Sequence, residues 1–266
     1  MKRILFLCDV DGTLVSGGKM SPAVIEAARE FTSRGHLLAL ATGRHKFSLG
    51  GLCAQLPINA PCVILAGAAV YDPVTDTCRR MIPMEEGVKH KLGEILKKYP
   101  RELAVQVFTG TTQFNLRLND FMRRYGIAEE VNKPDSPLSA LEGEQILKLG
   151  FNCEDKTVLE RCAEEFFSDS SRYEWHYSFR IAIEVCHPAA SKGNALRGLL
   201  SGGDIRADMV AVAGDSANDL SMFSCADIRF APSDAIPEIR AKADYVVSTA
   251  ENGCAADALR ILMSRE

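Results

Sequence analysis

Apolar runs that end in small or polar residues recur near both ends of the chain. Residues 4–8, 36–41, 62–66 and 209–214 are almost entirely apolar, and Asp, Thr or Gly follows each of them. Strands buried on both faces of a parallel sheet have such continuous apolar runs. These segments therefore predict strands of a parallel sheet, with polar residues at their carboxyl ends.

Helical periodicity between the runs completes the pattern. Residues 22–34 place apolar side chains at helical spacing, with Ser21 as the predicted N-cap and Gly35 after the last turn. Residues 192–200 predict another helix, and residues 228–230 and 245–247 predict two short strands. Strands that alternate with helices over short links form right-handed crossovers. We expect an α/β fold with a doubly wound, Rossmann-like parallel sheet.

The middle of the chain follows a different pattern. Between residues 83 and 186 charge is denser and apolar residues alternate more with polar ones. Residues 103–108 and 113–118 predict a β-hairpin across Thr109–Thr111. Helices are predicted at 119–125 and 155–167, and strands at 145–151 and 180–185. We interpret residues 83–186 as an inserted α+β domain, and residues 1–82 and 187–266 as one core domain.

Composition excludes several classes of function. The net charge of −4 provides no basic surface for nucleic acid or an anionic membrane. No apolar run is long enough to span a bilayer, and the amino terminus lacks the features of a signal peptide. The nine cysteines are scattered, without a Cys-x-x-Cys or a nearby His pair, so they indicate reduced thiols rather than a zinc site. We expect a cytoplasmic protein.

The first apolar run ends in two carboxylates one residue apart, Asp9 and Asp11, followed by Gly12 and Thr13. Ligands bind at the carboxyl ends of strands in open α/β sheets. Two close negative charges need a cation, a shared proton or a catalytic role to compensate their repulsion. Because Asp-Gly is also common in ordinary turns, this motif alone leaves a solvated turn as an alternative.

Three further motifs follow in order, each at a strand end or a helix start. They are Thr42-Gly43-Arg44, Lys192-Gly193 and Gly214-Asp215-Ser216-Ala217-Asn218-Asp219. The hydroxyl, backbone amides and cations suit anionic oxygens, and the carboxylates suit a hard cation such as Mg²⁺. Each motif alone is weak, since Thr-Gly-Arg is usually a turn and Asp often caps a helix. Together they predict a site for a metal and a phosphate group.

This ordered set resembles the four motifs of the haloacid dehalogenase (HAD) superfamily, and most closely its Cof-type phosphatases. The resemblance implies that Asp9 is the nucleophile and that Asp11 is the general acid and base. It implies Mg²⁺ held by Asp9, Asp215 and the main-chain carbonyl of Asp11, with Asp219 supporting the metal. Phosphate contacts are implied for Thr42 with Gly43 and Arg44, for Lys192 and for Asn218.

The resemblance also places the insert, because it lies between the second and third motifs, where the α/β caps of Cof-type members lie. Two loops depart from the family pattern: Ala66-Gly67 replaces Asn-Gly, and Ser233-Asp234-Ala235 replaces Gly-Asn-Ala. Candidate cap contacts with substrate exist, although a solvated or core role is more common for each type of residue. They are Arg117, Arg123, Arg124, Arg172, Trp175, His176 and Arg180.

The expected function is Mg²⁺-dependent hydrolysis of a small phosphorylated metabolite, most plausibly a sugar phosphate. Two alternatives remain at this point: a sugar phosphomutase on the same fold, and a regulator that binds a sugar phosphate without catalysis. A pure binder has no need of a nucleophile and acid pair, which argues against the regulator. Dehalogenase chemistry is the weakest reading, because the second aspartate and the metal set belong to phosphate chemistry.

Overall fold

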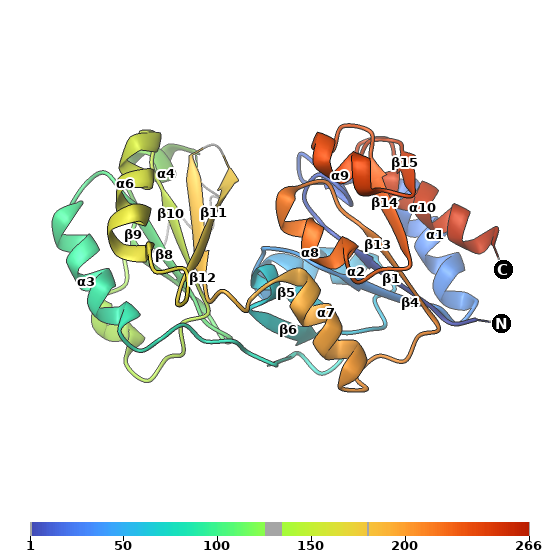
Figure 1. Ribbon diagram of the computed structural model, residues 1–266, viewed down its shortest axis with the longest axis horizontal. Coiled ribbons are helices and arrows are strands. Elements are labelled where there is room, and N and C mark those ends of the chain that lie inside the picture. Colours follow the sequence, from blue (N-terminus) through green and yellow to red (C-terminus); the bar gives the residue numbers. More distant parts are fainter. Residues whose placement is uncertain (1, 126–134, 180, 266) are drawn as a thin grey trace. The chain divides into compact units, whose positions relative to one another are not determined.

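The computed structural model describes residues 2–125, 135–179 and 181–265 (Figure 1). The chain divides into two compact units. The first is formed by Met1–Arg80 together with Ser191–Glu266, and the second by Met81–Ala190. Each unit has its own sheet and is described by itself.

The central sheet of the first unit is parallel, in the order β15-β14-β13-β1-β4. Every residue of the interior strand β1 is buried, as expected for a strand with neighbours on both edges and helices on both faces. The expected doubly wound α/β fold is confirmed. The strands are β1 (Ile4–Cys8), β4 (Leu37–Leu40), β13 (Met209–Ala213), β14 (Ile228–Pro232) and β15 (Tyr245–Val247).

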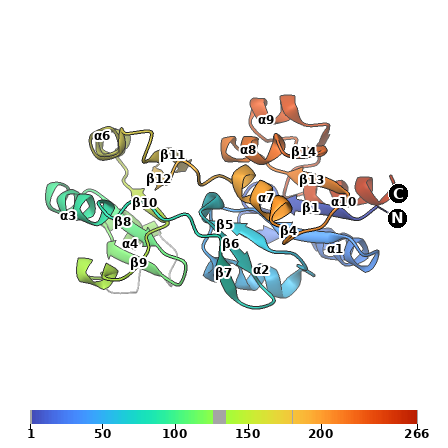
Figure 2. The same ribbon diagram turned by 60° about the horizontal axis from the view of Figure 1, so that its bottom comes forward.

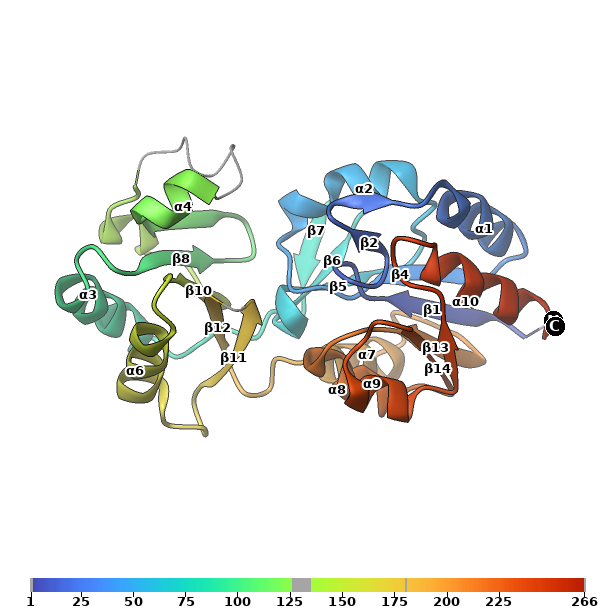
Figure 3. The ribbon, with the colours of Figure 1, turned by 90° about the horizontal axis from the view of Figure 1, so that it is seen from above.

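Helices cover both faces of this sheet (Figure 3). On one face α1 (Pro22–Ser33) packs against α10 (Cys254–Met263), and on the other α7 (Lys192–Ser201) packs against α8 (Leu220–Phe223). The ring of Phe6 in β1 meets Phe31 of α1 edge-on, with ring centroids 6.4 Å apart. The predicted helix after Ser21 is confirmed, and the chain leaves it through Gly35 at φ +89°.

The third predicted strand is shorter than expected. Strand β5 (Cys62–Ile64) ends at Ile64, because Leu65 and Ala66 adopt φ values of 51° and 56°. The prediction that it reaches Ala66 is therefore wrong. The turn continues through Gly67, where a Cβ would lie 2.2 Å from the carbonyl carbon of Ser191. Glycine is needed there because the loop lies directly against the start of α7.

The second unit has an antiparallel sheet in the order β11-β12-β10-β8-β9. Helices α3 (Val88–Lys98) and α6 (Lys156–Phe167) pack on one face of it through a common apolar core (Figure 2). The predicted hairpin is confirmed as β8 and β9; of the strand predicted at 180–185, residue 180 lies outside the described residues. The strands are β8 (Ala104–Phe108), β9 (Gln113–Arg117), β10 (Lys148–Asn152), β11 (Glu174–Phe179) and β12 (Ala182–Cys186).

Several short elements have no counterpart among the sequence predictions, and neither have α3, α10 and β11. The short elements are β2 (Val15–Ser16), β3 (Lys19–Met20), η1 (Lys46–Leu49), α2 (Gly50–Gln55), η2 (Leu65–Gly67), β6 (Ala69–Asp72), β7 (Thr77–Arg79), η3 (Leu138–Leu141), η4 (Ala217–Asp219) and α9 (Pro237–Lys242). The helix predicted at 119–125 is observed as α4 (Asp120–Tyr125). None of the described helices is both long and apolar enough to cross a membrane.

Candidate active site

Three carboxylates meet at the carboxyl ends of β1 and β13. Asp9 directly follows β1, and Asp215 lies two residues after β13. The backbone N–H of Asp9 donates to the carbonyl of Ala213 at 2.9 Å, so the pairing of the two strands continues up to the site. One carboxylate oxygen from each of Asp9, Asp215 and Asp219 lies within 4.8 Å of the others. The fold thus brings together residues about 200 positions apart in the sequence.

Lys192 lies among these carboxylates. Its Nζ donates to Asp9 Oδ1 at 2.5 Å and to Asp219 Oδ1 at 2.6 Å, and the residue is only 1% exposed. Lys192 is the first residue of α7, whose N-cap Ser191 accepts a hydrogen bond from the N–H of Asn194. An ammonium has three N–H groups, so one more can be offered to an anionic ligand.

Asp219 organises the loop after β13. Its Oδ2 accepts the backbone N–H groups of Asp215 and Ser216, both at 3.0 Å, while its Oδ1 accepts from Lys192. A Cβ on Gly214 would lie 2.5 Å from the Asp219 carboxyl carbon, so only glycine fits between this carboxylate and the strand end. Both oxygens of Asp219 are therefore used by the protein, and its role is to fix Asp215 and Lys192.

Thr13 is a site residue to which sequence reasoning gave no role. Its hydroxyl donates to Asp215 Oδ1 at 3.1 Å, and the residue is fully buried. The preceding Gly12 has φ +87°, and a Cβ there would lie 2.5 Å from Asp215 Oδ2. The available signal was position alone, since Gly12 and Thr13 directly follow Asp11 in the first motif.

The electrostatics of the cluster indicate excess negative charge. Burial raises the pKa of Asp9 well above its usual range; Lys192 opposes this shift, while Asp219 and Asp215 add to it. Burial and then the charge of Asp219 raise the pKa of Asp215 to about 6. Burial alone would lower the pKa of Lys192, but Asp219 and Asp9 together outweigh it and raise that pKa. The cluster thus places three carboxylates around one ammonium, an arrangement that favours binding of a further cation.

This donor set fits a divalent hard cation. Mg²⁺ is bound by a few carboxylate oxygens together with water and substrate phosphate. Asp9, Asp215 and Asp219 each offer a carboxylate oxygen to such an ion. Asp219 also accepts hydrogen bonds on both oxygens from Lys192 and the backbone, so Asp9 and Asp215 have the less engaged carboxylates. The side chain of Asp11 lies outside the group formed by the three acidic residues, which leaves its main-chain carbonyl as the donor expected from the sequence.

Thr42 and Gly43 follow β4 at the same edge of the sheet. Residue 41 is paired with β1, since the N–H of Ala41 donates to the Cys8 carbonyl at 2.8 Å. Thr42 is 1% exposed, and its hydroxyl accepts the N–H of Arg44 at 3.1 Å. Its own N–H donates to the Val63 carbonyl at 2.9 Å, which holds the loop against β5.

Arg44 pairs with Asp11 instead of pointing at the carboxylate cluster. Its Nε donates to Asp11 Oδ2 at 2.8 Å and its Nη2 to Asp11 Oδ1 at 2.6 Å. The hydrogen bonds that the guanidinium donates to Asp11 raise its pKa. Asn218, the other expected phosphate ligand, accepts a hydrogen bond from the Ser216 hydroxyl at 3.0 Å.

Four of the candidate substrate contacts, Arg117, Arg123, Arg172 and Trp175, have partners within the second unit. Arg117 donates to the carbonyls of Leu96 and Tyr99 at the end of α3, and Arg172 pairs with Glu85 at 2.8 Å. Arg123 pairs with Asp135, and Trp175 packs against the core of the unit. Arg180 lies outside the described residues. For Arg117 in particular, a helix-capping role accounts for the side chain.

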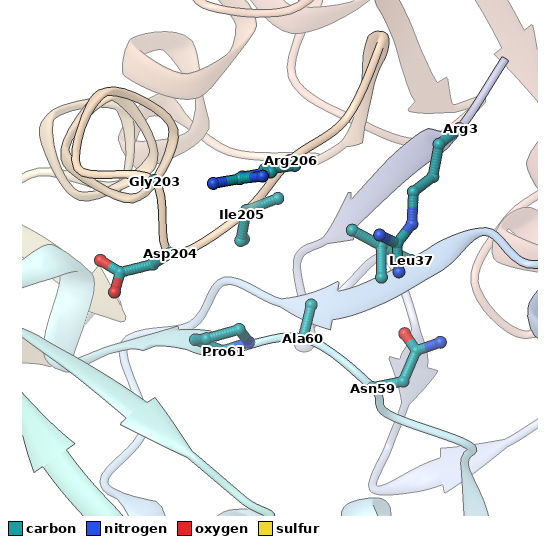
Figure 4. A pocket seen from close by; sticks show the side chains of 9 residues that line it. All are labelled: Arg3, Leu37, Asn59, Ala60, Pro61, Gly203, Asp204, Ile205 and Arg206. Atoms are coloured by element: carbon teal, nitrogen blue, oxygen red, sulfur yellow. The ribbon is translucent and has the colours of Figure 1, made fainter.

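A separate cavity of about 280 Å³ lies at the amino ends of β1 and β4 (Figure 4). Arg3 and Leu37, at the starts of these strands, line it together with Asn59 and Asp204. The Asn59 amide bonds the backbone of Leu38 and His36, and Asp204 bonds Arg80 at 2.6 Å. This cavity is at the end of the sheet opposite to the carboxylate cluster, so it is not part of the candidate active site.

Comparison with known proteins agrees with this geometry. Residues 6–259 match the family model of haloacid dehalogenase-like hydrolases. A 5-amino-6-(5-phospho-D-ribitylamino)uracil phosphatase of Bacillus subtilis, YwtE, is 27% identical over 93% of this chain and 94% of its own length.

Solved structures show the same fold. TM0651 from Thermotoga maritima superposes with a TM-score of 0.81 at 24% identity, covering 98% of this chain and 97% of its own. The sugar phosphatase BT4131, of HAD subclass IIB, superposes with a TM-score of 0.80 at 18% identity, covering 98% and 99% of the two chains.

Proposed function

The chain belongs to the haloacid dehalogenase-like hydrolase family, as a Cof-type phosphatase. We propose that it uses Mg²⁺ to hydrolyse a small phosphorylated metabolite, and that this metabolite is a sugar phosphate. The observation that supports this is the cluster of Asp9, Asp215 and Asp219 around the buried Lys192, in which three carboxylates surround one ammonium. Phosphoryl transfer requires a positioned nucleophile, neutralised charge and a proton donor.

Asp9 is the proposed nucleophile. Lys192 holds its Oδ1, which orients the carboxylate so that Oδ2 is left to attack phosphorus. The new bond joins Asp9 to phosphorus while the bond from phosphorus to the leaving oxygen breaks. Mg²⁺ bound by Asp9, Asp215 and the Asp11 carbonyl would supply charge neutralisation, and so offset the burial and repulsion that raise the pKa of Asp9.

Asp11 is the proposed general acid and base. It would give a proton to the leaving oxygen, and later accept one from the water that cleaves the phosphorylated Asp9. Phosphate then leaves and Asp9 returns to its starting form. Thr42, Gly43, Arg44 and Lys192 are the proposed ligands of the non-bridging oxygens, since these groups can donate hydrogen bonds to an anion. The support for Asn218 in this role is the sequence motif.

The second unit is the proposed specificity domain, and sugar phosphates are the proposed substrates. The B. subtilis relative acts on a phosphorylated ribityl compound, and a subclass IIB protein of the same fold is a sugar phosphatase. A cytoplasmic location is proposed as well, supported by nine cysteines that all have free thiols.

The direct test is phosphate release from a panel of sugar and other metabolite phosphates, with Mg²⁺ and with EDTA. We expect release with Mg²⁺ and none with EDTA. An isomeric sugar phosphate in place of free phosphate would instead identify a mutase. Binding of sugar phosphates without any turnover would identify a regulator and would contradict the proposal.

A further inference from the structure

The acid and base candidate of this site is engaged by a guanidinium. Both oxygens of Asp11 accept from Arg44, at 2.6 and 2.8 Å, in the two-pronged geometry of an arginine–carboxylate pair. In contrast to Asp9, whose side chain is 7% exposed, the Asp11 side chain is 49% exposed. Asp11 is thus the carboxylate of the site that sits at its open side and outside the cluster around Lys192.

This pairing competes with the contacts proposed for both residues. It engages both oxygens of Asp11 and two of the five N–H groups of Arg44. A phosphate ester that accepts from the same N–H groups of Arg44 would displace Asp11 from them.

The surroundings allow the guanidinium to move without the loop. The backbone of Arg44 is fixed, because its N–H donates to the Thr42 hydroxyl at 3.1 Å and its carbonyl accepts from Leu65 at 3.1 Å. Its side chain is 29% exposed, so solvent can reach the guanidinium when the pair opens. A phosphate ester can accept the same pair of hydrogen bonds from the guanidinium, and it carries more negative charge than one carboxylate.

We propose that Arg44 exchanges partners when substrate arrives, leaving Asp11 for the phosphate group, and that this exchange frees both Asp11 oxygens from their hydrogen bonds to the guanidinium. The inference rests on the proposed function of the site. Arg44 then has two roles: it binds phosphate in the complex, and it positions Asp11 in the empty enzyme.

Binding of inorganic phosphate in the presence of Mg²⁺, measured by calorimetry, tests the exchange without needing turnover. In Asp11→Asn the competing carboxylate is gone but the main-chain carbonyl remains, so phosphate should bind several-fold tighter than to the wild type. Adding Arg44→Ala to Asp11→Asn should then weaken binding about tenfold or more, because a charge-assisted hydrogen bond is lost. Arg44→Lys in the same background should restore part of that loss.

The matched control is Arg34→Ala, which removes another exposed arginine of the first unit, paired with Glu30 at 2.5 Å on α1. It should leave phosphate binding unchanged. Equal phosphate affinities for Asp11→Asn and for its double variant with Arg44→Ala would overturn the exchange while wild-type phosphatase turnover remains intact. Absence of Mg²⁺-dependent turnover in the wild type would overturn the proposed function, and the exchange with it.

Discussion

Both units of the chain bury a lysine against carboxylates, and the two sites differ in charge balance. In the second unit Lys148 is 2% exposed, pairs with Glu184 at 2.7 Å and lies 4.8 Å from the centre of the Phe108 ring. In the first unit Lys192 is 1% exposed and bonds two carboxylates, with Asp215 as a third nearby.

The difference separates a structural ion pair from a reactive site. One carboxylate against one ammonium is neutral and can be satisfied by the sheet itself. Three carboxylates against one ammonium are not neutral, and such imbalance is typical of places where a protein binds a cation or performs chemistry. A buried lysine therefore indicates a structural ion pair in the second unit and a candidate reactive site in the first.

Substitution of Asp9 should reduce activity more than any other change in the cluster. Asp9→Asn should lower phosphate release on the order of 10⁴-fold or more, because the nucleophile is lost. Its melting temperature should stay equal or rise, since a buried carboxylate with a raised pKa is removed. Asp208→Asn is the control: Asp208 lies before β13, at the opposite end of the sheet, where it accepts the N–H of Arg3. Undiminished turnover by Asp9→Asn would contradict the assignment of the nucleophile.

The two lysines can then be exchanged for methionine in parallel. Lys192→Met should lower kcat/KM for a generic phosphate ester by about 10²–10³, the usual effect of losing a donor to developing charge. Lys148→Met should leave that value within about threefold, but lower the free energy of unfolding by about 3 kcal/mol, because Glu184 loses its buried partner. Adding Glu184→Gln to Lys148→Met should recover part of the stability. Equal losses of activity from the two single variants would remove the distinction between the units.

The dependence of stability on Mg²⁺ and pH tests the role of the carboxylates around Lys192. The pKa of Asp215 is raised to about 6 from an ordinary 3.8. Between these two pH values Asp215 is protonated in the native state and ionised in the unfolded chain. Stability without metal should therefore fall as pH rises through this window. Mg²⁺ binds the ionised form, so it should stabilise strongly at pH 7.5 and weakly at pH 5. The gain should reach about 2.7 kcal/mol at 100 times the Kd. A Mg²⁺ effect on the melting temperature that is the same at both pH values would contradict this linkage.

The smallest expected effect concerns Thr13. Thr13→Val removes the hydroxyl that donates to Asp215 Oδ1 but keeps the shape of the side chain. Loss of a group that orients a metal ligand typically weakens metal binding about tenfold, so the Mg²⁺ concentration for half-maximal activity should rise by that factor. Thr13→Ser retains the hydroxyl and should behave like the wild type. A normal Mg²⁺ requirement in Thr13→Val would show that Asp215 is positioned without this bond.

Much of the fold follows from local pattern. The strands β1 and β13 are readable because continuous apolar runs have few other uses, and α1 is readable from Ser21, Pro22 and Gly35. The short hairpin of β6 and β7 is not readable in this way, because three or four residues are too few to establish a period. The end of β5 was misjudged because Leu65 and Ala66 are apolar yet adopt positive φ, which the packing of Gly67 on Ser191 accounts for.

The amino-acid pattern alone predicts the chemical groups of the site and their places at strand ends and at a helix start: Asp9, Thr42, Lys192 and Asp215. The partner of each group depends on how the chain folds. Lys192 lies between Asp9 and Asp219, Thr13 holds Asp215, and Arg44 takes Asp11 rather than the cluster. The physical reason is that strand order and helix packing set distances between residues far apart in the chain. Charge interactions depend on those distances and on burial, and neither is a property of the sequence pattern.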